Sequence, residues 1–461
     1  MKNWYGKDAY AFGREFLYYS GQDADKIIFW GRIPMVILSF LLGLVIFFWA
    51  KELFGLKASF FSLFLYSFCP NIIAHSQLVT PDIGVCLFTT LSVYCLWRYL
   101  TKPNGLRLIF TGITLGLSLL SKFNSLVLLP IFLILIYIYG PRGRFFVLTF
   151  IVLLLAFFVI WSGYSFETGK ILEEKEMHPT LSQLIKNPSE LLQRVIHFIG
   201  HRVFPFPSYF KGLGWILHAN INKHESFFMG KHFRGSSVLG FLIAFIIKTP
   251  IPFLIFIFFS IILAIKNRIF LHKEQLFLWL LPMIIFLING FFSFSLHLKY
   301  ILPIYPFLCI FIGQIVNSDF FRLHLFRLFI LGLCLWYLLG TLDIYPHYLA
   351  YFNEFVGGPK YGYKYLVDSN LDWGQDLKLL KQYLDRNNIS EIKLAYFGTA
   401  DPDYYRINYQ RLEPFKPTSG WIAISVTYLQ GIHTLNGGYD WLKKYEPEVR
   451  IGYSIFLYNL K

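Results

Sequence analysis

Residues 33–50 read Ile33-Pro-Met-Val-Ile-Leu-Ser-Phe-Leu-Leu-Gly-Leu-Val-Ile-Phe-Phe-Trp-Ala50, an uncharged run long enough to approach a full crossing of a bilayer. Similar apolar stretches recur as far as Leu342. A helix satisfies its own backbone amides in lipid, so these stretches predict a helical membrane protein. The predicted spans are residues 33–50, 58–74, 82–98, 106–121, 124–140, 145–163, 237–265, 276–292, 300–316 and 325–343.

The composition agrees with this prediction and shows where the membrane-spanning part of the chain ends. Of the 461 residues, 56% are hydrophobic and 15% are charged, whereas soluble domains carry about 25% charged residues. Charges, Gly and Asn return after Ile344. The tail has a helical pattern over 376–388 and strand patterns over 391–397, 421–429 and 453–460, which together predict a small α/β domain. The predicted fold class is therefore mainly α: a polytopic helical membrane protein with a small C-terminal α/β domain.

The net charge of +15 has a pattern that predicts orientation. The short loops near residues 51–57, 98–107, 142–144, 266–273 and 322–327 are basic and poor in acidic residues, which is typical of cytoplasmic loops. No block of basic residues with interleaved aromatic residues suggests a nucleic-acid partner. We expect a multi-pass protein of the cell (inner) membrane. The expected domains are an external segment 1–32, six spans over 33–163, an external loop with amphipathic helices over 164–236, four spans over 237–343 and an external α/β domain over 344–461.

Four local features add detail to this arrangement. Residues 181–200 form an amphipathic pattern, and Trp215 and Phe227 are expected near the membrane interface. Lys248-Thr249-Pro250 interrupts the seventh span and predicts a kink or break, since proline removes a helix donor. The five cysteines lie within or beside apolar spans and show neither a disulfide framework nor paired zinc spacing. The N-terminal residues contain no apolar signal-peptide core.

Ionisable residues at membrane depth are costly and are therefore candidates for function. The external ends of the predicted spans hold one carboxylate among basic groups, and Lys248 lies inside the seventh span. Lysines can bind a leaving phosphate and stabilise developing charge, and a carboxylate can accept a proton from an acceptor hydroxyl. This set suits transfer of a sugar from a polyprenyl phosphate. Its members are His75, Asp82, Lys122, Lys248, His297 and Lys299.

Each of these residues also has a structural explanation. Asp82 could cap the third span. Lys122 and Lys248 could extend their ammonium groups to the interface, and His297 could be a buried histidine with satisfied hydrogen bonds. His197 and His201 have helical i, i+4 spacing, but two ligands alone rarely make a metal site.

The strings Asn71-Ile-Ile-Ala-His75 and Leu78-Val-Thr-Pro-Asp82 resemble the second external loop of family 39-like C-type membrane glycosyltransferases. This group is related to dolichyl-phosphate-mannose protein mannosyltransferases and to the transferase that adds aminoarabinose to lipid A. Ser121-Lys122-Phe123 resembles their basic turn, and His297-Leu-Lys299-Tyr300 resembles a later external motif. The strings 351–358 and 368–376 resemble the tail signature of a bacterial branch, in which Asp372 and Trp373 could contact sugar or acceptor.

The resemblance implies the C-type glycosyltransferase fold, a polyprenyl-phosphate-linked sugar donor, and a protein, lipid or glycan acceptor. It implies inverting transfer outside the membrane, with Asp82 in a supporting catalytic role. His75, Lys122, Lys248, His297, Lys299, Tyr300, Asp372 and Trp373 are the expected substrate-binding residues. No metal ligands are assigned, although a divalent cation could take part.

The sequence departs from the family at its principal catalytic acid, which belongs to an Asp-Glu pair after the family's first span. Asp8, Asp23 and Asp25 do not fit that pair. Together with the external start deduced from loop charge, this departure leads us to expect a chain that lacks the first span, or an inactive relative. A transporter or flippase of a lipid-linked saccharide is a second functional class, although no internal repeat of the transporter kind is visible. A non-catalytic relative is a third.

Overall fold

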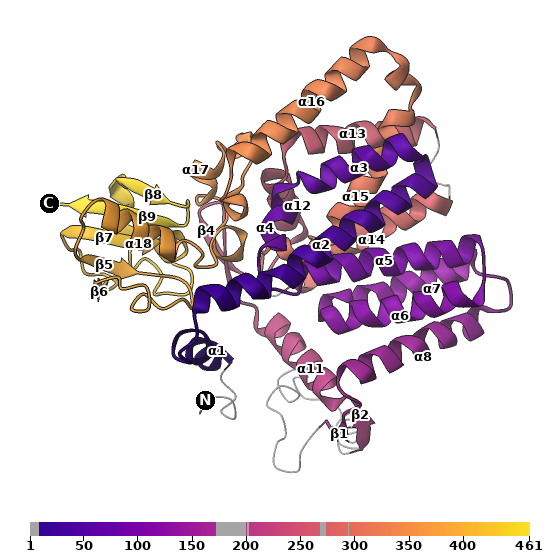
Figure 1. The fold of residues 1–461 in the computed structure, drawn as a ribbon, viewed down its shortest axis with the longest axis horizontal. Coiled ribbons are helices and arrows are strands. Elements are labelled where there is room, and N and C mark those ends of the chain that lie inside the picture. The colour runs from indigo at the N-terminus through magenta and orange to yellow at the C-terminus, as the bar shows by residue number, and fades with distance from the viewer. Residues whose placement is uncertain (1–8, 172–199, 201, 268–272, 294) are drawn as a thin grey trace.

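The computed structural model describes residues 9–171, 200, 202–267, 273–293 and 295–461. A bundle of apolar helices occupies one side of the molecule, and a small sheet with its own helix lies at the other (Figure 1). This confirms the predicted fold class. The principal helices are α1 (Ala9–Tyr18), α2 (Ala24–Phe54), α3 (Leu56–Ser67), α4 (Pro70–Ser76), α5 (Asp82–Thr101), α6 (Gly105–Ser121), α7 (Leu128–Tyr139), α8 (Phe145–Gly163), α11 (Pro207–Asn222), α12 (Val238–Lys248), α13 (Ile251–Lys266), α14 (Lys273–Phe292), α15 (Ile304–Gly313), α16 (His324–Asp343) and α18 (Leu377–Arg386).

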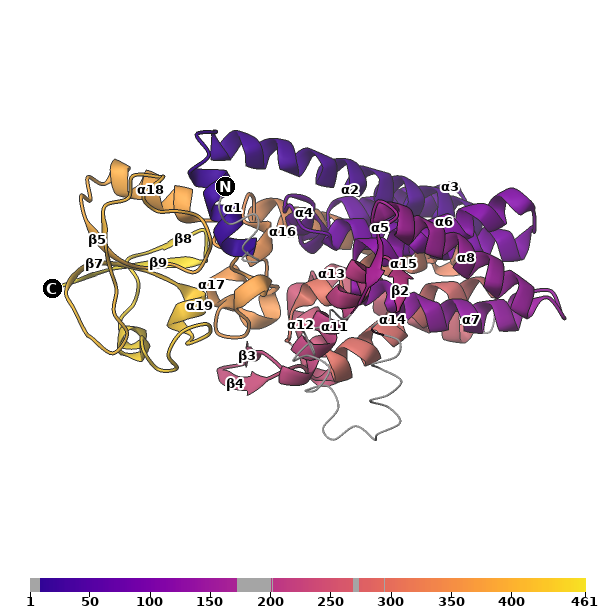
Figure 2. The ribbon, with the colours of Figure 1, turned by 90° about the horizontal axis from the view of Figure 1, so that it is seen from below.

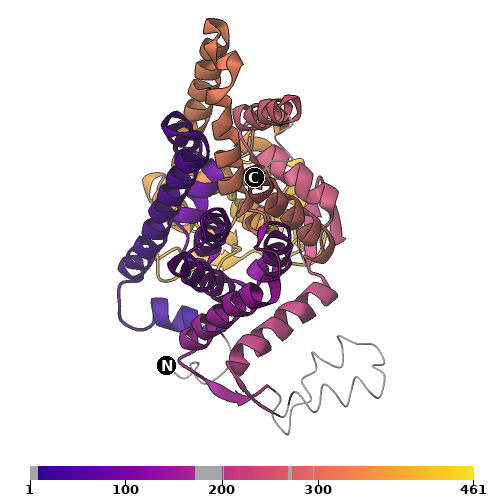
Figure 3. The same ribbon diagram turned by 90° about the vertical axis from the view of Figure 1, so that its right-hand side faces the viewer.

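Five helices of the described chain are long and apolar enough to cross a membrane, or up to seven if each of two bent pairs counts as one span. The five helices are α2, α5, α8, α14 and α16. Large apolar side chains on their outer faces are exposed, as Phe40 and Phe146 illustrate. Such faces suit contact with lipid rather than with water. Viewed from the end away from the sheet, α16 projects from the rest of the bundle (Figure 3).

The break predicted at Lys248-Thr249-Pro250 is confirmed, because α12 and α13 meet there at a bend of 116°. A bend of this size leaves the last carbonyl groups of α12 without helical partners. Asn353, from the tail, provides hydrogen-bond donors to the backbone carbonyl groups at the break: its Nδ2 donates to Ile246 O at 2.6 Å and to Thr249 O at 2.8 Å. Its backbone N–H donates to Ile247 O. Broken helices at membrane depth need such protein partners.

Two small residues allow close helix packing on the other side of the bundle. Gly112 and Gly116 stand four residues apart on α6 and face α8. A Cβ atom at Gly112 would lie 2.5 Å from the Cβ of Leu155, and one at Gly116 would lie 2.6 Å from the Cβ of Val159. Small residues at this spacing let helix backbones approach closely in a membrane. The α6–α8 contact therefore depends on these glycines.

The described part of the 164–236 loop forms a helix and two small two-stranded sheets. Strand β1 (Thr168–Lys170) pairs with β2 (Val203–Pro205), and β3 (Glu225–Phe228) pairs with β4 (Lys231–Arg234). Trp215 on α11 is exposed. Phe227 is not at an exposed interface, which corrects that expectation: it is buried against Val367 and Ile432 of the tail. The β3–β4 hairpin accordingly lies beside the α/β domain (Figure 2). Except for Gly200, the predicted amphipathic segment 181–200 lies outside the described residues.

The tail contains a mixed five-stranded sheet in the order β6-β5-β7-β9-β8. Strand β5 is parallel to both β6 and β7, whereas β9 is antiparallel to β7 and β8. Apolar side chains of α18 (Leu377, Leu380 and Leu384) pack on one face of this sheet. The strands are β5 (Ile392–Ala395), β6 (Tyr409–Arg411), β7 (Gly420–Ser425), β8 (Val449–Ile451) and β9 (Ile455–Leu460).

The start of the described chain is attached to this sheet domain. Arg14 on α1 forms an ion pair with Asp401 at 3.0 Å. Asp25, in the first turn of α2, accepts hydrogen bonds from Lys378 at 2.9 Å and from the Tyr405 hydroxyl at 3.1 Å. The α/β domain is therefore fixed to the same end of the bundle at which α2 begins (Figure 1).

Candidate functional site

A buried ion pair joins α5 to the end of α6. Lys122 ends α6 with an extended backbone, and its Nζ lies 2.6 Å from Oδ1 of Asp82, the first residue of α5. The Asp82 side chain is 2% exposed, and Lys122 is 19% exposed. Thr80 donates to the other carboxylate oxygen at 3.0 Å, and His75 Nδ1 lies 3.5 Å from it. A buried charge requires such partners.

For Asp82 and Lys122, the sequence left open both a functional role and a purely structural one, and this geometry argues against the structural explanation of each residue. The N-cap residue of α5 is Pro81, and the Asp82 carboxylate accepts from Thr80 and Lys122 rather than from the helix backbone. Lys122 is paired with a carboxylate and does not simply extend toward solvent. Both residues are thus parts of one charged cluster. His75 is buried behind Asp82, so it supports the carboxylate and does not line an open surface.

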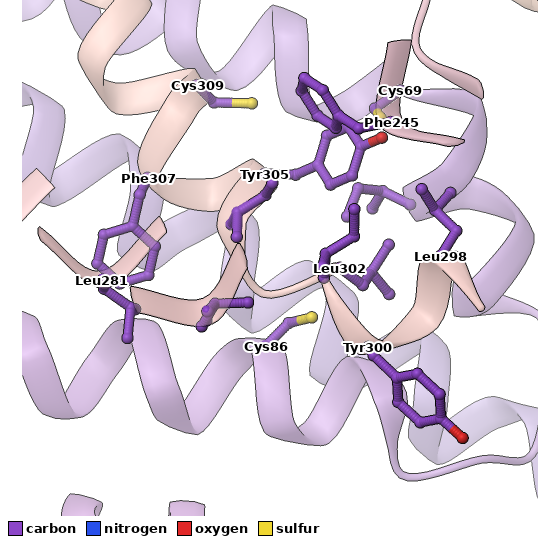
Figure 4. Packing of buried hydrophobic residues seen from close by; sticks show 14 of the residues in the cluster. Cys69, Cys86, Phe245, Leu281, Leu298, Tyr300, Leu302, Tyr305, Phe307 and Cys309 are labelled. Carbon is purple, nitrogen blue, oxygen red and sulfur yellow. The ribbon is translucent and has the colours of Figure 1, made fainter. Parts of the chain in front are cut away.

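Tyr300 brings the second basic motif to this pair. It belongs to a 3-10 turn, Leu298–Tyr300, that precedes α15. Its ring points away from the apolar cluster formed by Tyr305, Leu302 and their neighbours (Figure 4). The Nζ atoms of Lys122 and Lys299 lie 5.3 and 5.7 Å from its ring centroid, within cation–π range. Two ammonium groups that are far apart in the sequence therefore share one aromatic ring.

The tail completes this side of the cluster. Lys299 Nζ lies 3.2 Å from Ser369 Oγ and 4.7 Å from the ring centroid of Trp373. Trp373 is in turn anchored, because its indole N–H donates to Ser369 O at 3.2 Å. Trp373 therefore lies beside one of the basic residues, while its predicted contact with sugar or acceptor stays a prediction. The lysines, Tyr300 and Trp373 combine positive charge with aromatic faces, which suits a phosphate joined to a sugar.

Asp368 links the membrane motif to the α/β domain. Its Oδ2 lies 2.7 Å from His433 Nε2 and 3.5 Å from His297 Nε2. Burial alone would raise the pKa of Asp368, but the two histidines hold it well below its usual range. The hydrogen bond to Asp368 raises the pKa of His433. His297 is thus joined to an ionic link between the two parts of the molecule.

The structure places two expected substrate-binding residues elsewhere. Lys248 is 1% exposed, and its Nζ donates to Leu349 O at 2.8 Å and to Asn370 O at 2.6 Å. These hydrogen bonds attach the end of α12 to the tail, so Lys248 has a structural role here. Asp372 is 0% exposed and accepts from Gly374 N at 2.9 Å and Thr427 Oγ1 at 3.0 Å. Neither side chain is available to a substrate, which corrects both assignments.

A second buried carboxylate lies at the first turn of α18. Asp376 accepts from Ser454 Oγ at 2.6 Å and makes no capping bond to α18. Burial raises the pKa of Asp376 to about 7. His347 Nδ1 lies 3.9 Å from its Oδ1, and both residues line a cavity of about 180 Å³ together with Arg32. The Asp376 carboxylate thus points toward Ser454, between β8 and β9, and does not cap α18 through its side chain.

A larger cavity, of about 940 Å³, lies in the α/β domain. It opens at the carboxyl ends of the parallel strands β5, β6 and β7, where ligands commonly bind to open α/β sheets. His433, which binds Asp368, forms part of its wall. Other lining residues are Arg14, Tyr396, Tyr409, Arg411, Tyr428 and Tyr439.

Sequence reasoning did not identify three members of this site: Asp368, Ser369 and His433. Asp368 and Ser369 lie within the quoted tail string, and the left-handed backbone of Asp368 (φ 56°) marks a constrained turn. His433 stands alone in its loop, with no sequence signal of its role. No group of three or more potential metal ligands occurs among the described residues. His197 and His201 lie outside them.

The first part of the chain is similar to a known protein family. Residues 25–163 match a family model described as dolichyl-phosphate-mannose-protein mannosyltransferase. The resemblance is confirmed over this segment, which contains His75, Asp82 and Lys122. No curated protein matches the chain.

Among solved structures, the chain is similar to ArnT from Cupriavidus metallidurans bound to undecaprenyl phosphate. The sequences are 12% identical, the match covers 93% of this chain and 83% of that chain, and the TM-score is 0.41. The same protein in the apo state matches with 12% identity, coverage of 92% and 82%, and a TM-score of 0.39.

Proposed function

We propose that this chain is a membrane glycosyltransferase that moves a sugar from a polyprenyl-phosphate carrier to an acceptor outside the membrane. The observation that carries the proposal is the convergence of Lys122 and Lys299 on Tyr300, beside the buried Asp82. The family match over residues 25–163 supports the same reaction class. Our proposal also names the cell (inner) membrane and its periplasmic side as the location.

The proposed reaction breaks the bond between the anomeric carbon and the carrier phosphate, and forms a bond between that carbon and an acceptor oxygen. The leaving polyprenyl phosphate gains negative charge as the bond breaks. Lys122 and Lys299 stabilise that charge, because fixed cations in a partly buried site act more strongly than they do in water. The acceptor loses its proton to a base. Asp82 is buried and paired, so we give it the role of positioning Lys122.

The acceptor would approach from the α/β domain. The cavity at the carboxyl ends of β5, β6 and β7 has tyrosine and arginine side chains on its wall, and His433 connects that wall to Asp368. Aromatic faces and hydrogen-bonding groups suit a glycan or a glycosylated lipid headgroup, whereas a protein acceptor would need only its hydroxyl to reach the lysines. The bundle end that carries the basic loops lies opposite, which is why we propose the external face.

The decisive experiment measures sugar transfer by the full chain in proteoliposomes. Radiolabelled polyprenyl-phosphate hexoses and pentoses are supplied as donors, and envelope extract from a deletion strain is supplied as acceptor. Lys122→Ala and Lys299→Ala should each lower transfer about 100-fold, the scale seen when a group that stabilises developing charge is removed. Lys364→Ala is the control, since Lys364 lies over Tyr361 in the tail, away from the cluster.

Unchanged transfer in both lysine variants would reject the phosphate assignment. Movement of a lipid-linked saccharide across the vesicle membrane without transfer would identify a flippase instead. We expect EDTA to leave the rate unchanged, because the two ammonium groups supply the positive charge that a divalent cation would otherwise provide. Mass spectrometry of glycans, lipids and glycoproteins from the deletion strain then identifies the acceptor by the modification that is lost.

A further inference from the structure

A histidine–carboxylate pair connects the candidate phosphate site to the cavity of the α/β domain. Asp368 Oδ2 lies 2.7 Å from His433 Nε2. The other carboxylate oxygen, Oδ1, accepts from Ser369 Oγ at 2.9 Å, and that hydroxyl lies 3.2 Å from Lys299 Nζ. The histidine and the lysine therefore contact the same dipeptide, one through its carboxylate and the other through its hydroxyl.

Contacts from distant parts of the chain hold the His433 ring in place. The ring stacks on Phe397, which follows β5, with centroids 5.4 Å apart and an interplanar angle of 3°. His433 and Asp368 both have left-handed backbones, with φ of 59° and 56°. Residues other than glycine keep this conformation only where the surrounding structure imposes it, and such residues cluster at functional sites. The pair is therefore a constrained feature of the fold.

The imidazole of His433 is accessible to a ligand. Its side chain is 43% exposed and forms part of the wall of the cavity of about 940 Å³. Asp368 binds Nε2, so Nδ1 is the ring nitrogen left for a ligand. With the proton on Nε2, Nδ1 has the lone pair that can accept a proton. A hydroxyl that enters from the cavity can therefore meet a basic nitrogen whose tautomer is fixed by a carboxylate.

The other carboxylate and imidazole groups near the two lysines suit a base less well. Asp82 is 2% exposed and is paired with a lysine. His75 and Asp372 are likewise buried, and the side chain of His297 is 12% exposed. A general base must reach the proton that it removes. Of these groups and His433, only His433 combines wide exposure with a carboxylate partner.

We propose that His433 is the general base that activates the acceptor hydroxyl, with Asp368 as its positioning residue; this assignment rests on the proposed glycosyl transfer. His433 Nδ1 takes the proton of the hydroxyl as the acceptor oxygen bonds to the anomeric carbon. The bond between that carbon and the carrier phosphate breaks, and its electron pair leaves with the phosphate. The imidazolium that forms lies beside the Asp368 carboxylate, which stabilises its charge.

Charged groups from several segments surround the proposed base. The hydrogen bond to Asp368 raises the pKa of His433 above 6.5, and the charge of Glu225 on β3 adds to this effect. Glu225 is itself paired with His232 of β4 at 3.0 Å, and His297 lies 3.5 Å from the same Asp368 oxygen that binds His433. A reaction that requires neutral His433 should therefore become faster as pH rises through a midpoint above 6.5.

Chemical rescue of transfer by the full chain in proteoliposomes tests the assignment, with a radiolabelled polyprenyl-phosphate sugar as donor and envelope extract as acceptor. His433→Gly should lower the rate at saturating donor about 100-fold, because general base catalysis contributes about 10²–10⁴-fold. KM for the donor should not change. Glycine suits the left-handed backbone at this position and leaves space for a small base. Added imidazole should therefore restore much of the rate. His324→Gly, at the exposed first residue of α16, is the matched control.

The pH dependence of the rate provides a second measurement that does not need the glycine variant. The wild-type rate should rise between pH 5.5 and 8.5. Asp368→Asn should lower the rate and move the midpoint to lower pH, since the hydrogen bond to Asp368 is the main cause of the raised pKa of His433. A wild-type rate that does not change over this range would overturn the assignment, even if His433→Gly is not recovered folded.

The outcomes separate this assignment from the proposed function. A wild-type rate in His433→Gly, or a lowered rate that imidazole does not restore, would overturn the role of His433 as base. If Lys122→Ala and Lys299→Ala still abolish transfer in that case, the proposed function stands without it. Absence of transfer by the wild-type chain with every donor would overturn both.

Discussion

Lys122 Nζ lies 2.6 Å from Asp82 Oδ1, and this contact joins two residues that are 40 positions apart at the ends of neighbouring helices. Removing either partner leaves the other charge buried and unpaired, which is more damaging than losing the contact itself. The pair therefore acts as a unit. It also fixes the ammonium group that contacts Tyr300.

We predict that Asp82→Asn and Lys122→Ala are strongly non-additive. Each single change should lower kcat/KM for transfer, and the double variant should be little worse than Lys122→Ala alone. A coupling free energy of about 1–3 kcal/mol is expected for contacting charged residues. A double-mutant cycle on transfer rate measures this. Additive losses would show that Asp82 acts on the substrate independently of Lys122.

Trp373 should tune donor binding through Lys299. Its ring centroid lies 4.7 Å from Lys299 Nζ, and a cation–π contact contributes about 0.5–2 kcal/mol. Trp373→Leu should therefore raise KM for the polyprenyl-phosphate sugar about 3- to 10-fold, and Trp373→Phe should recover part of that loss. Steady-state kinetics with varied donor concentration distinguishes the two variants. Equal KM values for Leu and Phe would remove Trp373 from the donor site.

The Asp368–His433 ion pair should make stability depend on pH. The pKa of His433 is raised from 6.5 in the folded state. Its contribution is therefore fully present below about pH 6.5 and is lost as pH rises through the higher folded pKa. Because the pKa of Asp368 is lowered, that residue's contribution is lost at the acidic end, as pH falls below about 4. His433→Gln should remove the loss of stability on the alkaline side.

Thermal unfolding of wild type and His433→Gln, measured in detergent from pH 5 to 9, checks this expectation. His297 is retained in both proteins, so its titration is common to them. The difference in Tm should be largest at pH 5 to 6 and should shrink toward pH 9. A constant difference across the range would mean that the charge of His433 does not contribute.

The buried Asp376 should make the folded protein less stable as pH rises, whereas a carboxylate with a lowered pKa stabilises the fold at higher pH. Burial raises its folded pKa from 3.8 to about 7, so the folded protein retains a proton that the unfolded chain loses. Stability then falls as pH rises from about 4 to about 7. Asp376→Asn keeps the shape and removes this loss, so the variant should have a Tm several degrees above wild type at pH 8. The exposed Asp385→Asn serves as control. A lower Tm for Asp376→Asn at pH 8 would contradict the assignment.

Gly374 should tolerate no side chain. Its φ is 71°, and a Cβ there would lie 2.5 Å from Tyr396 Oη and 2.7 Å from Gly398 Cα. Gly374→Ala combines a left-handed backbone with overpacking, so we expect a loss of about 2–4 kcal/mol. Thermal unfolding of the purified chain measures it. Gly214→Ala, on α11 with open space around it, should be neutral or slightly stabilising.

Local patterns predicted much of the fold. Apolar runs indicated the helices of the bundle, and the Lys248-Thr249-Pro250 string predicted the break after α12. Alternation in the tail predicted β5, β7 and β9, although β7 ends at Ser425 and a short helix, Val426–Leu429, follows it. The sequence could not predict that Asn353 satisfies the carbonyl groups at the break, because that contact spans more than a hundred residues.

The residues of the candidate site also fall into those that the sequence could predict and those that it could not. Asp82, Lys122, His297, Lys299 and Tyr300 were recognisable because charge beside an apolar span is costly and rarely accidental. Lys248 is also a charged residue within an apolar span, yet its ammonium group donates hydrogen bonds to two backbone carbonyl groups. Asp372 likewise belongs to the same string as Trp373 but points into the domain, toward Thr427. Residue type and position along the sequence do not distinguish a side chain that lines the candidate site from one that is buried in a structural contact.

By itself, the sequence determined which segments are apolar enough to prefer lipid, where a helix must break, and which residues carry charge at the ends of the helices. These properties depend on near neighbours along the chain. The tertiary structure alone decided that Lys122 and Lys299 share Tyr300 and that Asp368 binds His433. Such pairings depend on how helices pack and on where the α/β domain attaches, and side-chain burial and partner choice follow from that packing.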